Sequence, residues 1–381
     1  MLKNNQDKIW LDDTLAKVIN KWERITQDTQ DAIASTVINN IYDDKSAPGE
    51  YNPDDGIYWW TNGFYPGILW LLYLETNNEF FKNLANKIED KLDAALLGFD
   101  GLHHDVGFMW LTSAVANFRI TENDQSKSRG LLAASILASR FNHKGGYIRA
   151  WNYDLAGWAI IDCMLNINIL YWASEQLNDP RFADIARMHA DKALTHFVRP
   201  DGSVNHIVVF NPETGEEIEV KGGQGYEVGS SWSRGQGWAL YGFILSYIHT
   251  KDRKYMDAAK KIAHYFISCI QDDFIPRCDF RAPSEPIIKD TSAGAIAACA
   301  LIEIAKHVPE HEQALYLNSA VNILKALTEH CTDFSEDTHE LLKMGTGSYH
   351  HVESRHISLI YGDYYYLEAL LKLKGSDILL W

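Results

Sequence analysis

Two aspartates could carry acid–base chemistry because each lies beside an apolar segment. Asp162 falls within the apolar run Trp158–Leu165, which we expect to be helical. An ionised aspartate is costly to bury unless it is paired, so Asp162 has a reason to be there, and a buried ion pair explains it as well as catalysis does. Asp105 follows His103 and His104, where a loop meets an apolar helix. Taken alone, Asp105 is better explained as a helix N-cap.

The two carboxyl groups can act together as an acid–base pair only if the fold brings them close to each other. Two carboxyls in one aromatic cavity push their pKa values apart, which leaves one protonated as an acid and the other ionised as a stabiliser. The sequence does not show that Asp105 and Asp162 meet. Aromatic residues make up 12% of the chain, including 12 Trp, and such rings can either fill a core or provide flat walls for sugars.

Two adjacent histidine pairs, His103 with His104 and His350 with His351, raise the question of a metal site. Adjacent residues on a helix or strand point in different directions, and no ligand spacing such as H-E-x-x-H occurs. We therefore predict no metal.

The glycine-rich segments Gly222–Gly225 and Ser233–Trp238 do not follow a strand within a βαβ unit, so we predict no nucleotide cofactor and interpret them as sugar-contacting loops. Arg234 precedes Trp238 by four residues, which places a guanidinium and an indole on one helical face, suited to a carboxylate and a sugar ring. A helix-start salt bridge with a core tryptophan fits this spacing equally well.

The charge and cysteine content exclude several classes of protein. A net charge of −16 without a Lys/Arg-rich run argues against nucleic acid or an anionic membrane surface as a partner. The five cysteines contain no C-x-x-C pair, so neither disulfides nor a zinc site are indicated. The polar start and the lack of a long apolar run predict a cytoplasmic protein, or a periplasmic one if a leader has been removed. We predict no obligatory protein partner.

Apolar residues recur at three- and four-residue spacing along most of the chain, which predicts about twelve helices. We expect them at Ile9–Trp22, Gly63–Leu74, Phe80–Leu97, Val106–Phe118, Leu131–Phe141, Ala156–Gln176, Arg181–Phe197, Gly235–Ile248, Tyr255–Ile270, Ala293–Ile304, Glu312–Leu327 and Tyr361–Leu373.

Short turns such as Asn178-Asp179-Pro180 close several helix pairs, and longer glycine-rich or aromatic loops separate the pairs. One such loop, Asn205–Val220, contains an expected β-hairpin. Six pairs with long loops at one end predict an all-α (α/α)6 barrel over residues 1–381, as a single domain whose loop face holds the site. An irregular helical bundle or solenoid remains the alternative.

Several segments, in this combination and order, resemble the unsaturated glucuronyl hydrolases of glycoside hydrolase family 88. They are Trp59-Trp60-Thr61-Asn62-Gly63-Phe64, His103-His104-Asp105, Ile161-Asp162-Cys163-Met164-Leu165-Asn166, Trp232-Ser233-Arg234-Gly235-Gln236-Gly237-Trp238 and Gly362-Asp363-Tyr364-Tyr365-Tyr366-Leu367-Glu368-Ala369-Leu370.

The resemblance implies an (α/α)6 barrel without a cofactor, in which Asp105 and Asp162 form the active-site pair. It also implies substrate contacts at Trp59, His104, Trp151, His206, Gln224, Arg234 and Trp238. The chain departs from the family pattern between Ser348 and Gly362, where relatives acting on sulfated substrates carry Ser-x-x-Ser-x-Lys. Ser354 and Arg355 are candidates there for contact with the leaving sugar, without a motif behind them.

The chemistry that this resemblance implies is hydration of the C4=C5 enol ether of a 4,5-unsaturated glucuronyl residue at the non-reducing end of a glycosaminoglycan-type oligosaccharide. Asp162 is the expected general acid and base, and Asp105 its stabilising partner. The alternatives are a rhamnogalacturonyl hydrolase acting on pectin fragments, an (α/α)6 lyase or epimerase, and a sugar-binding protein.

Overall fold

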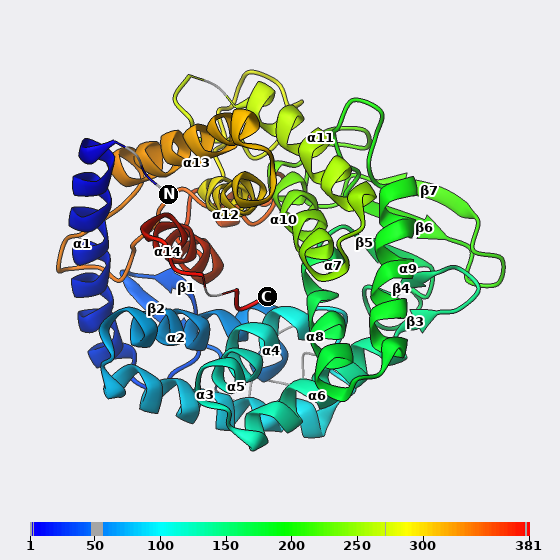
Figure 1. Ribbon diagram of the computed structural model, residues 1–381, viewed down its shortest axis with the longest axis horizontal. Helices are drawn as coiled ribbons and strands as arrows, with labels where there is room; N and C mark the ends of the chain where they lie inside the picture. Colours follow the sequence, from blue (N-terminus) through cyan, green and yellow to red (C-terminus); the bar gives the residue numbers. More distant parts are fainter. Residues whose placement is uncertain (1, 3, 47–55, 271, 378) are drawn as a thin grey trace.

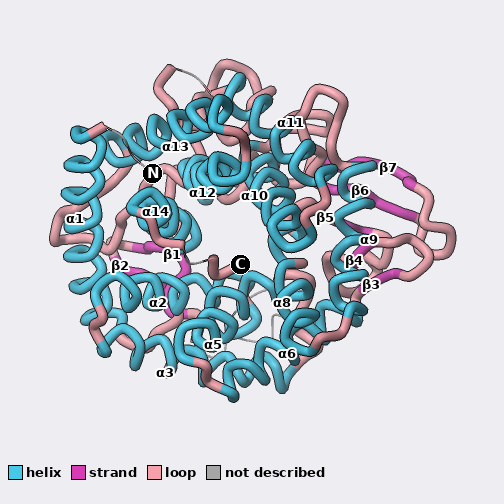
Figure 2. Tube along the Cα trace, in the orientation of Figure 1, coloured by secondary structure: helices cyan, strands magenta, loops and turns pink. Residues whose placement is uncertain are grey.

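The helices of the protein form a double ring, seen from above in Figures 1 and 2. The computed structural model describes residues 2, 4–46, 56–270, 272–377 and 379–381. The inner ring consists of α2 (Phe64–Thr76), α4 (Val106–Trp110) continued by α5 (Ala116–Thr121), α7 (Cys163–Asn166) with α8 (Asn168–Leu177), α10 (Ser233–Thr250), α12 (Thr291–His307) and α14 (Ile360–Lys374). The outer ring consists of α1 (Asn5–Thr29), α3 (Glu79–Gly98), α6 (Asp124–Ser139), α9 (Pro180–His196), α11 (Arg253–Cys269) and α13 (Glu310–His330).

Each inner helix packs against an outer helix that is its neighbour in sequence, except that α14 closes the ring on α1 and α2. This arrangement of six pairs, made of the described residues, confirms the predicted (α/α)6 barrel. The main hydrophobic cluster of the described residues extends from Leu2 to Trp381. The single domain stays a prediction. None of the described helices is both long and apolar enough to span a membrane.

Burial separates the two rings. Every residue from Thr291 to Ala305 of α12 is buried, as expected for a helix enclosed on all sides. In outer helix α3 the buried residues recur at three- and four-residue spacing, from Phe81 through Leu84 and Ile88 to Leu92. The outer helices therefore present one apolar face to the inner ring and a polar face to solvent.

The predicted turns hold because their residues cap outer helices. The side chains of Asn78, Asp179 and Asp252 each accept a hydrogen bond from a backbone N–H in the first turn of α3, α9 and α11. Pro180 occupies the first position of α9, where a missing N–H costs nothing.

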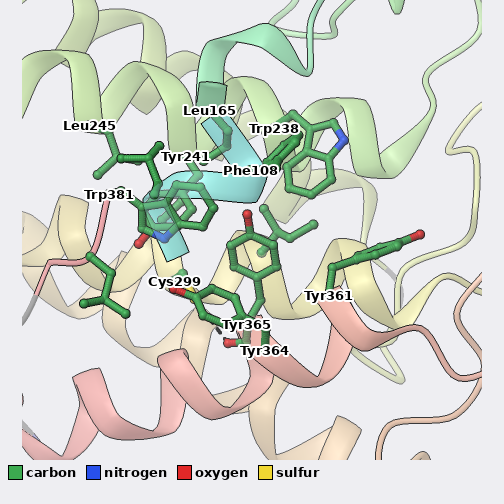
Figure 3. Packing of buried hydrophobic residues seen from close by; sticks show 14 of the residues in the cluster. Phe108, Leu165, Trp238, Tyr241, Leu245, Cys299, Tyr361, Tyr364, Tyr365 and Trp381 are labelled. Carbon is green, nitrogen blue, oxygen red and sulfur yellow. Dashed lines mark hydrogen bonds between the residues drawn. The ribbon is translucent and has the colours of Figure 1, made fainter. Parts of the chain in front are cut away.

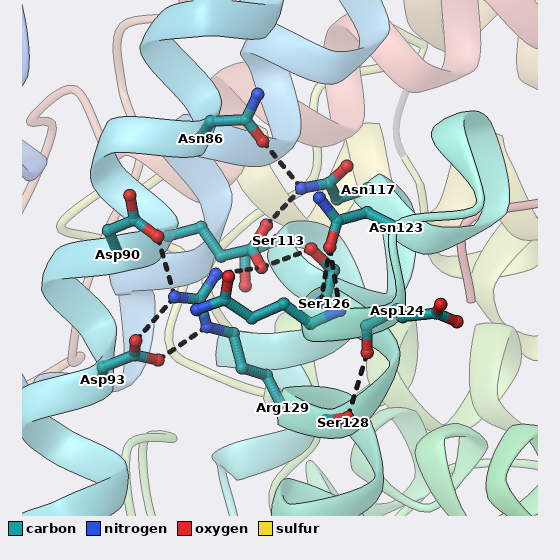
Figure 4. Close-up of polar contacts among 12 residues, drawn as sticks. Asn86, Asp90, Asp93, Ser113, Asn117, Asn123, Asp124, Ser126, Ser128 and Arg129 are labelled. Atoms are coloured by element: carbon teal, nitrogen blue, oxygen red, sulfur yellow. Dashed lines mark hydrogen bonds and ion pairs between the residues drawn. The ribbon is translucent and has the colours of Figure 1, made fainter.

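A buried ion cluster joins α3 to α6 (Figure 4). The guanidinium of Arg129 contacts Glu89 and Asp90, both at 2.7 Å, and Asp93 at 2.5 Å. Glu89 also accepts hydrogen bonds from Ser126 at 2.6 Å and from Asn117 at 2.7 Å. The buried carboxylate of Glu89 is thus fully paired, which removes most of the cost of burying it.

The centre of the ring is filled by aromatic side chains (Figure 3). Trp381, fully buried, stacks on Tyr365 with ring centroids 5.6 Å apart and planes 9° from parallel. Its indole N–H donates to Glu368 at 3.1 Å. The last residues of the chain therefore lie in the middle of the barrel, as Figure 1 shows.

The prediction of one helix over Ala156–Gln176 was wrong at its start. Trp158–Ile160 form strand β5, which pairs antiparallel with β6 (Ile207–Phe210), and β6 pairs with β7 (Glu217–Lys221) in the expected hairpin. A short apolar run cannot be assigned to helix or strand from periodicity alone. Here the run becomes a strand because it pairs with the edge of β6. Asp162 consequently lies between β5 and α7, and not in the middle of a helix.

Several short elements complete the described chain. The strands β1 (Ala34–Ile38) and β2 (Ile41–Asp44) form a hairpin that we did not predict. The strands β3 (Phe141–Asn142) and β4 (Tyr147–Ile148) form a second one, in the segment Asn142–Asp154 whose sequence indicates a hairpin or loop. Single turns of 3-10 helix occur at Gly56–Tyr58, Trp60–Gly63 and Val352–Ser354, and a π-helical turn at Leu111–Val115 joins α4 to α5.

Asp363 should make the stability of the fold depend on pH. Its buried carboxyl accepts hydrogen bonds from the Tyr42 hydroxyl at 2.6 Å and the Leu342 N–H at 2.9 Å. Burial nevertheless raises the pKa of Asp363 to about 7. The pKa of Asp363 is thus higher in the folded protein than in the unfolded chain. Asp363 therefore makes its full contribution to the stability of the folded protein at pH values below the unfolded pKa, where its carboxyl is protonated. This contribution is lost as the pH rises through about 7, with a total of roughly 4 kcal/mol.

Asp363→Asn, which cannot ionise, should therefore gain stability relative to wild type between about pH 4 and about pH 7. Urea unfolding of both proteins at the two pH values measures this difference. A difference in unfolding free energy that is the same at both pH values would contradict the prediction.

Candidate active site

A cavity of about 460 Å³ opens among the loops of the barrel. Its walls come from segments that are far apart in the sequence: the β1 strand, the 3-10 turn after Trp59, the loop after β7, the start of α10 and the segment before α14. The side chains of Trp59, Trp60 and Tyr361 make its walls aromatic. Such walls suit the flat apolar faces of sugar rings.

Asp105 precedes α4 but does not cap it, so the N-cap explanation is wrong. Its carboxyl instead faces other side chains: Oδ1 accepts a hydrogen bond from the Asn166 amide at 2.9 Å and lies 3.3 Å from Nε2 of His104. Oδ2 lies 3.3 Å from Nδ1 of His103. The carboxyl is buried within a polar cluster that the surrounding loop creates.

Asp162 likewise precedes a helix, α7, without capping it. Its Oδ1 lies 3.6 Å from Nε2 of His206, and neither atom has a hydrogen-bond partner. Nδ1 of His206 accepts the backbone N–H of Gln224 at 3.0 Å, so the ring hydrogen of neutral His206 is on Nε2, directed at Asp162.

Asp105 and Asp162 meet at Asn166. The amide nitrogen of Asn166 donates to the carboxyl of Asp105 and lies 3.3 Å from the backbone oxygen of Asp162. The two aspartates that the sequence singled out thus directly precede the adjacent inner helices α4 and α7.

The electrostatics of the site favour protonation of one carboxyl and neutrality of the histidines. Burial, followed by the negative charge of Asp162, raises the pKa of Asp105 well above its usual value. Burial lowers the pKa of His103 to about 3 and that of His104 well below its usual range. The raised pKa therefore belongs to Asp105, which we had expected to be the ionised partner.

The geometric reason that we gave against a metal at His103 and His104 was wrong. These residues lie in a turn, where neighbouring side chains can converge, and their rings are 5.7 Å apart and tilted by 34°. One ligand atom from each of His103, His104 and Asp105 lies within 4.8 Å of the others. The absence of a metal stays a prediction.

Three predicted contact residues lie at or beside the cavity. Trp59 lines it and is held by a hydrogen bond from its indole to the Ser35 hydroxyl at 3.0 Å. Gln224 lines it too and donates to the Gly347 carbonyl at 2.8 Å. His206 connects this wall to Asp162 through the contacts given above.

Arg234 and Trp238 fit the alternative interpretation of their spacing, a salt bridge at the start of a helix together with a core tryptophan. Arg234 reaches the cavity wall, but its guanidinium is bound by Asp290 at 2.7 Å and by the carbonyls of Thr346 and Gly347. Trp238 is completely buried and packs on Phe108, with ring centroids 5.0 Å apart (Figure 3). A direct substrate contact of Trp238 therefore finds no support in this geometry.

The remaining predicted residues are spread over the site. His104 is fully buried behind Asp105, so its role is to support that carboxyl. Trp151 is half-buried against Trp158, 5.8 Å away, outside the lining of the cavity. Ser354 lines the cavity, while Arg355 directs its guanidinium to the carbonyl of Tyr349.

Three important residues were not among our site candidates: Asn166, Asp290 and Tyr361. Asn166 and Tyr361 lie in or next to the quoted motifs, and a buried asparagine in an apolar run is a signal that could have been used. Asp290 could not have been found, because its pairing with Arg234 joins residues 56 positions apart.

An (α/α)6 barrel with two buried carboxyls beside an aromatic cavity is the arrangement of a glycoside hydrolase. The family model of Glycosyl Hydrolase Family 88 matches residues 29–371. The chain therefore belongs to glycosyl hydrolase family 88, as its motifs indicated.

Curated relatives include an unsaturated chondroitin disaccharide hydrolase of Streptococcus pneumoniae, 36% identical over 84% of this chain and 83% of the relative. An unsaturated glucuronyl hydrolase of Bacillus sp. strain GL1 is 36% identical over 83% of this chain and 86% of the relative. Among solved structures, an unsaturated glucuronyl hydrolase from Streptococcus agalactiae has a TM-score of 0.90 and 32% identity, covering 98% of this chain and 94% of that one.

Gly223 should be essential for the position of His206. Gly223 has φ +59°, and a Cβ built on it would lie 2.0 Å from Nδ1 of His206. Gly223→Ala should displace the ring from the Gln224 N–H and from Asp162, and lower turnover of an unsaturated chondroitin disaccharide by about 100-fold.

Gly229→Ala is the matched control, because Gly229 lies in the same loop with φ +81° but has no atom within 4 Å of a built Cβ. Both variants carry the same backbone strain, about 1–3 kcal/mol. Equal activity of the two variants would contradict the role of Gly223.

Proposed function

We propose that the protein releases 4,5-unsaturated glucuronic acid from the non-reducing end of lyase-generated oligosaccharides. The observation that carries the proposal is the pair Asp105 and Asp162, both buried and both in contact with Asn166, behind the Gln224 wall of an aromatic cavity in a family 88 barrel. Solved relatives support the substrate class: one is a complex with dGlcA-Glc-Rha-Glc, with a TM-score of 0.89, and another a mutant with dGlcA-GalNAc6S, with a TM-score of 0.84.

The proposed reaction is hydration of an enol ether. Asp162, in the state in which it carries the proton of the pair and Asp105 is ionised, gives that proton to C4 of the unsaturated ring, which creates an oxocarbenium-like centre at C5. Ionised Asp162 then takes a proton from the water that attacks C5. The resulting hemiketal opens and expels the remaining sugar, so the glycosidic bond breaks indirectly.

Asp105 is the stabilising partner in this scheme. While Asp162 is ionised, burial and the charge of Asp162 raise the pKa of Asp105, so the proton of the pair has to lie on Asp162 before the reaction begins. The positive charge that develops at C5 favours the ionised form of a nearby carboxyl and so opposes these effects. Asp105 is thereby suited to respond to charge that appears only during the reaction.

The surroundings of Asp162 fit its proposed role. The side chain of His206 is fixed by the backbone of Gln224 and directs an N–H at Asp162 without forming a close hydrogen bond. A proton-transferring carboxyl has to be held in place while at least one of its oxygens remains available to the substrate.

Asp162→Asn should abolish the reaction. The amide can neither donate the proton to C4 nor accept one from water, so we expect kcat to fall by about 100- to 10,000-fold. Loss of the ultraviolet absorbance of the conjugated double bond reports the reaction, with a panel of unsaturated glucuronyl and rhamnogalacturonyl disaccharides as substrates.

Asp363→Asn is the matched control, since it makes the same change at a buried carboxyl that faces Tyr42 and Leu342. It should keep the activity of wild type. Reaction only with rhamnogalacturonyl members would favour the pectin-fragment alternative. No reaction of folded wild-type protein with any member would refute the hydration mechanism.

We further propose that the leaving sugar is preferentially unsulfated. Among the described residues lining the cavity, Arg234 is the only Lys or Arg, and Asp290 neutralises it. The ring of His350 is likewise occupied, with Nε2 2.6 Å from the Tyr226 carbonyl. A sulfate placed here gains little electrostatic stabilisation from these side chains.

Matched unsaturated chondroitin disaccharides, with and without a 6-sulfate, test this preference. We expect kcat/KM to be about tenfold higher for the unsulfated compound, which corresponds to about 1.4 kcal/mol. A higher kcat/KM for the sulfated compound would overturn the proposal while leaving the hydration mechanism intact.

A further inference from the structure

Asn166, the last residue of α7, contacts both halves of the active site. Its Oδ1 accepts the backbone N–H of Phe108 at 2.7 Å. Its Nδ2 donates to Oδ1 of Asp105 at 2.9 Å and lies 3.3 Å from the backbone oxygen of Asp162. We propose that Asn166 is a positioning residue that fixes Asp105 relative to Asp162 for proton transfer. This inference rests on the function proposed above.

The direction of the amide is determined by its surroundings. A backbone N–H can be met only by an acceptor, so the oxygen of Asn166 must face Phe108. The NH2 group must then face Asp105 and deliver a hydrogen to one of its two oxygens. This bond favours the ionised form of Asp105 and so lowers its pKa, against the effects of burial and Asp162.

Gly107 allows this contact by letting α4 and α7 approach closely. A Cβ built on Gly107 would lie 2.4 Å from Cα of Asn166, 2.5 Å from its backbone oxygen and 2.7 Å from Oδ1. Two of these atoms are backbone and cannot move aside. The absence of a side chain at Gly107 thus brings the Asn166 amide within hydrogen-bond distance of Asp105.

Asn168 shows what a purely structural asparagine does in the same place. It is fully buried, two residues further along, and its Nδ2 donates only to backbone oxygens, those of Met164 at 3.2 Å and Leu165 at 2.8 Å. The amide nitrogen of Asn168 donates to neither active-site carboxyl. The two asparagines are equally buried and differ in what they bind.

The first experiment compares Asn166→Ala with Asn168→Ala. Asn166→Ala should lower kcat/KM by about 100-fold, mainly through kcat, because Asp105 loses the bond that orients it. The limb of the pH profile that reports Asp105 should move to higher pH, since a donor to the ionised form is gone. Asn168→Ala should lower the melting temperature without changing the profile. Equal losses of activity with unchanged profiles would overturn the proposal.

Asn166→Asp keeps the variant close to the native shape. The aspartate retains the acceptor for the Phe108 N–H and nearly the same volume, but it replaces the donor to Asp105 by a second acceptor. We expect a folded protein whose Asp105 is protonated up to a higher pH than in wild type. Wild-type activity and pH profile in this variant would contradict the proposed role.

A titration of the aspartate carboxyl carbons by 13C NMR separates this inference from the proposed function. The Asp105 signal, assigned by its loss in Asp105→Asn, should titrate at higher pH in Asn166→Ala than in wild type. In Asn168→Ala it should titrate at the same pH as in wild type. An unshifted signal overturns the role of Asn166 whatever the substrate. A shifted signal in a protein whose wild type does not consume unsaturated glucuronides supports that role and refutes the proposed function.

Discussion

The active site depends on burying two carboxyl groups side by side inside an apolar barrel. Each charge loses hydration there, and each repels the other, so both cannot be ionised without compensation. The structure compensates through a raised pKa of Asp105, neutral histidines around it and one amide donor from Asn166. The same repulsion favours a state in which only one of the two carboxyls is ionised.

The double ring provides what this arrangement requires. Inner helices enclosed on all sides hold their first residues in fixed positions, and the carboxyls of Asp105 and Asp162 stand just before two of them. Close approach is possible where side chains are missing: a Cβ on Gly63 would lie 2.3 Å from the Met109 carbonyl, as one on Gly107 would meet Asn166. The outer helices and the aromatic centre around Trp381 hold the inner ring in place.

Chemistry and recognition are divided between different parts of the molecule. The carboxyl pair stands directly before two inner helices, whereas the cavity wall comes from loops, short strands and helix starts in five parts of the chain. Loops tolerate sequence change better than enclosed helices do. This division explains why the catalytic motifs match the family while the segment between Ser348 and Gly362 departs from it. The usual relation between carboxylate separation and stereochemistry assumes direct attack at the anomeric carbon, and it does not apply to hydration of the double bond.

The sequence determined the helices and their pairing, because helical periodicity and capping residues such as Asp179 are local properties of the chain. The resemblance of their motifs to a known family, and not their local surroundings, singled out the two aspartates. Only the tertiary structure decided which strand β5 would join, and thereby that Asp162 stands at the start of a helix. It also decided that Arg234 is neutralised by Asp290 and that Trp238 belongs to the core. These outcomes depend on contacts between residues tens of positions apart, and hydrogen-bonding capacity and burial are assigned only when such segments meet.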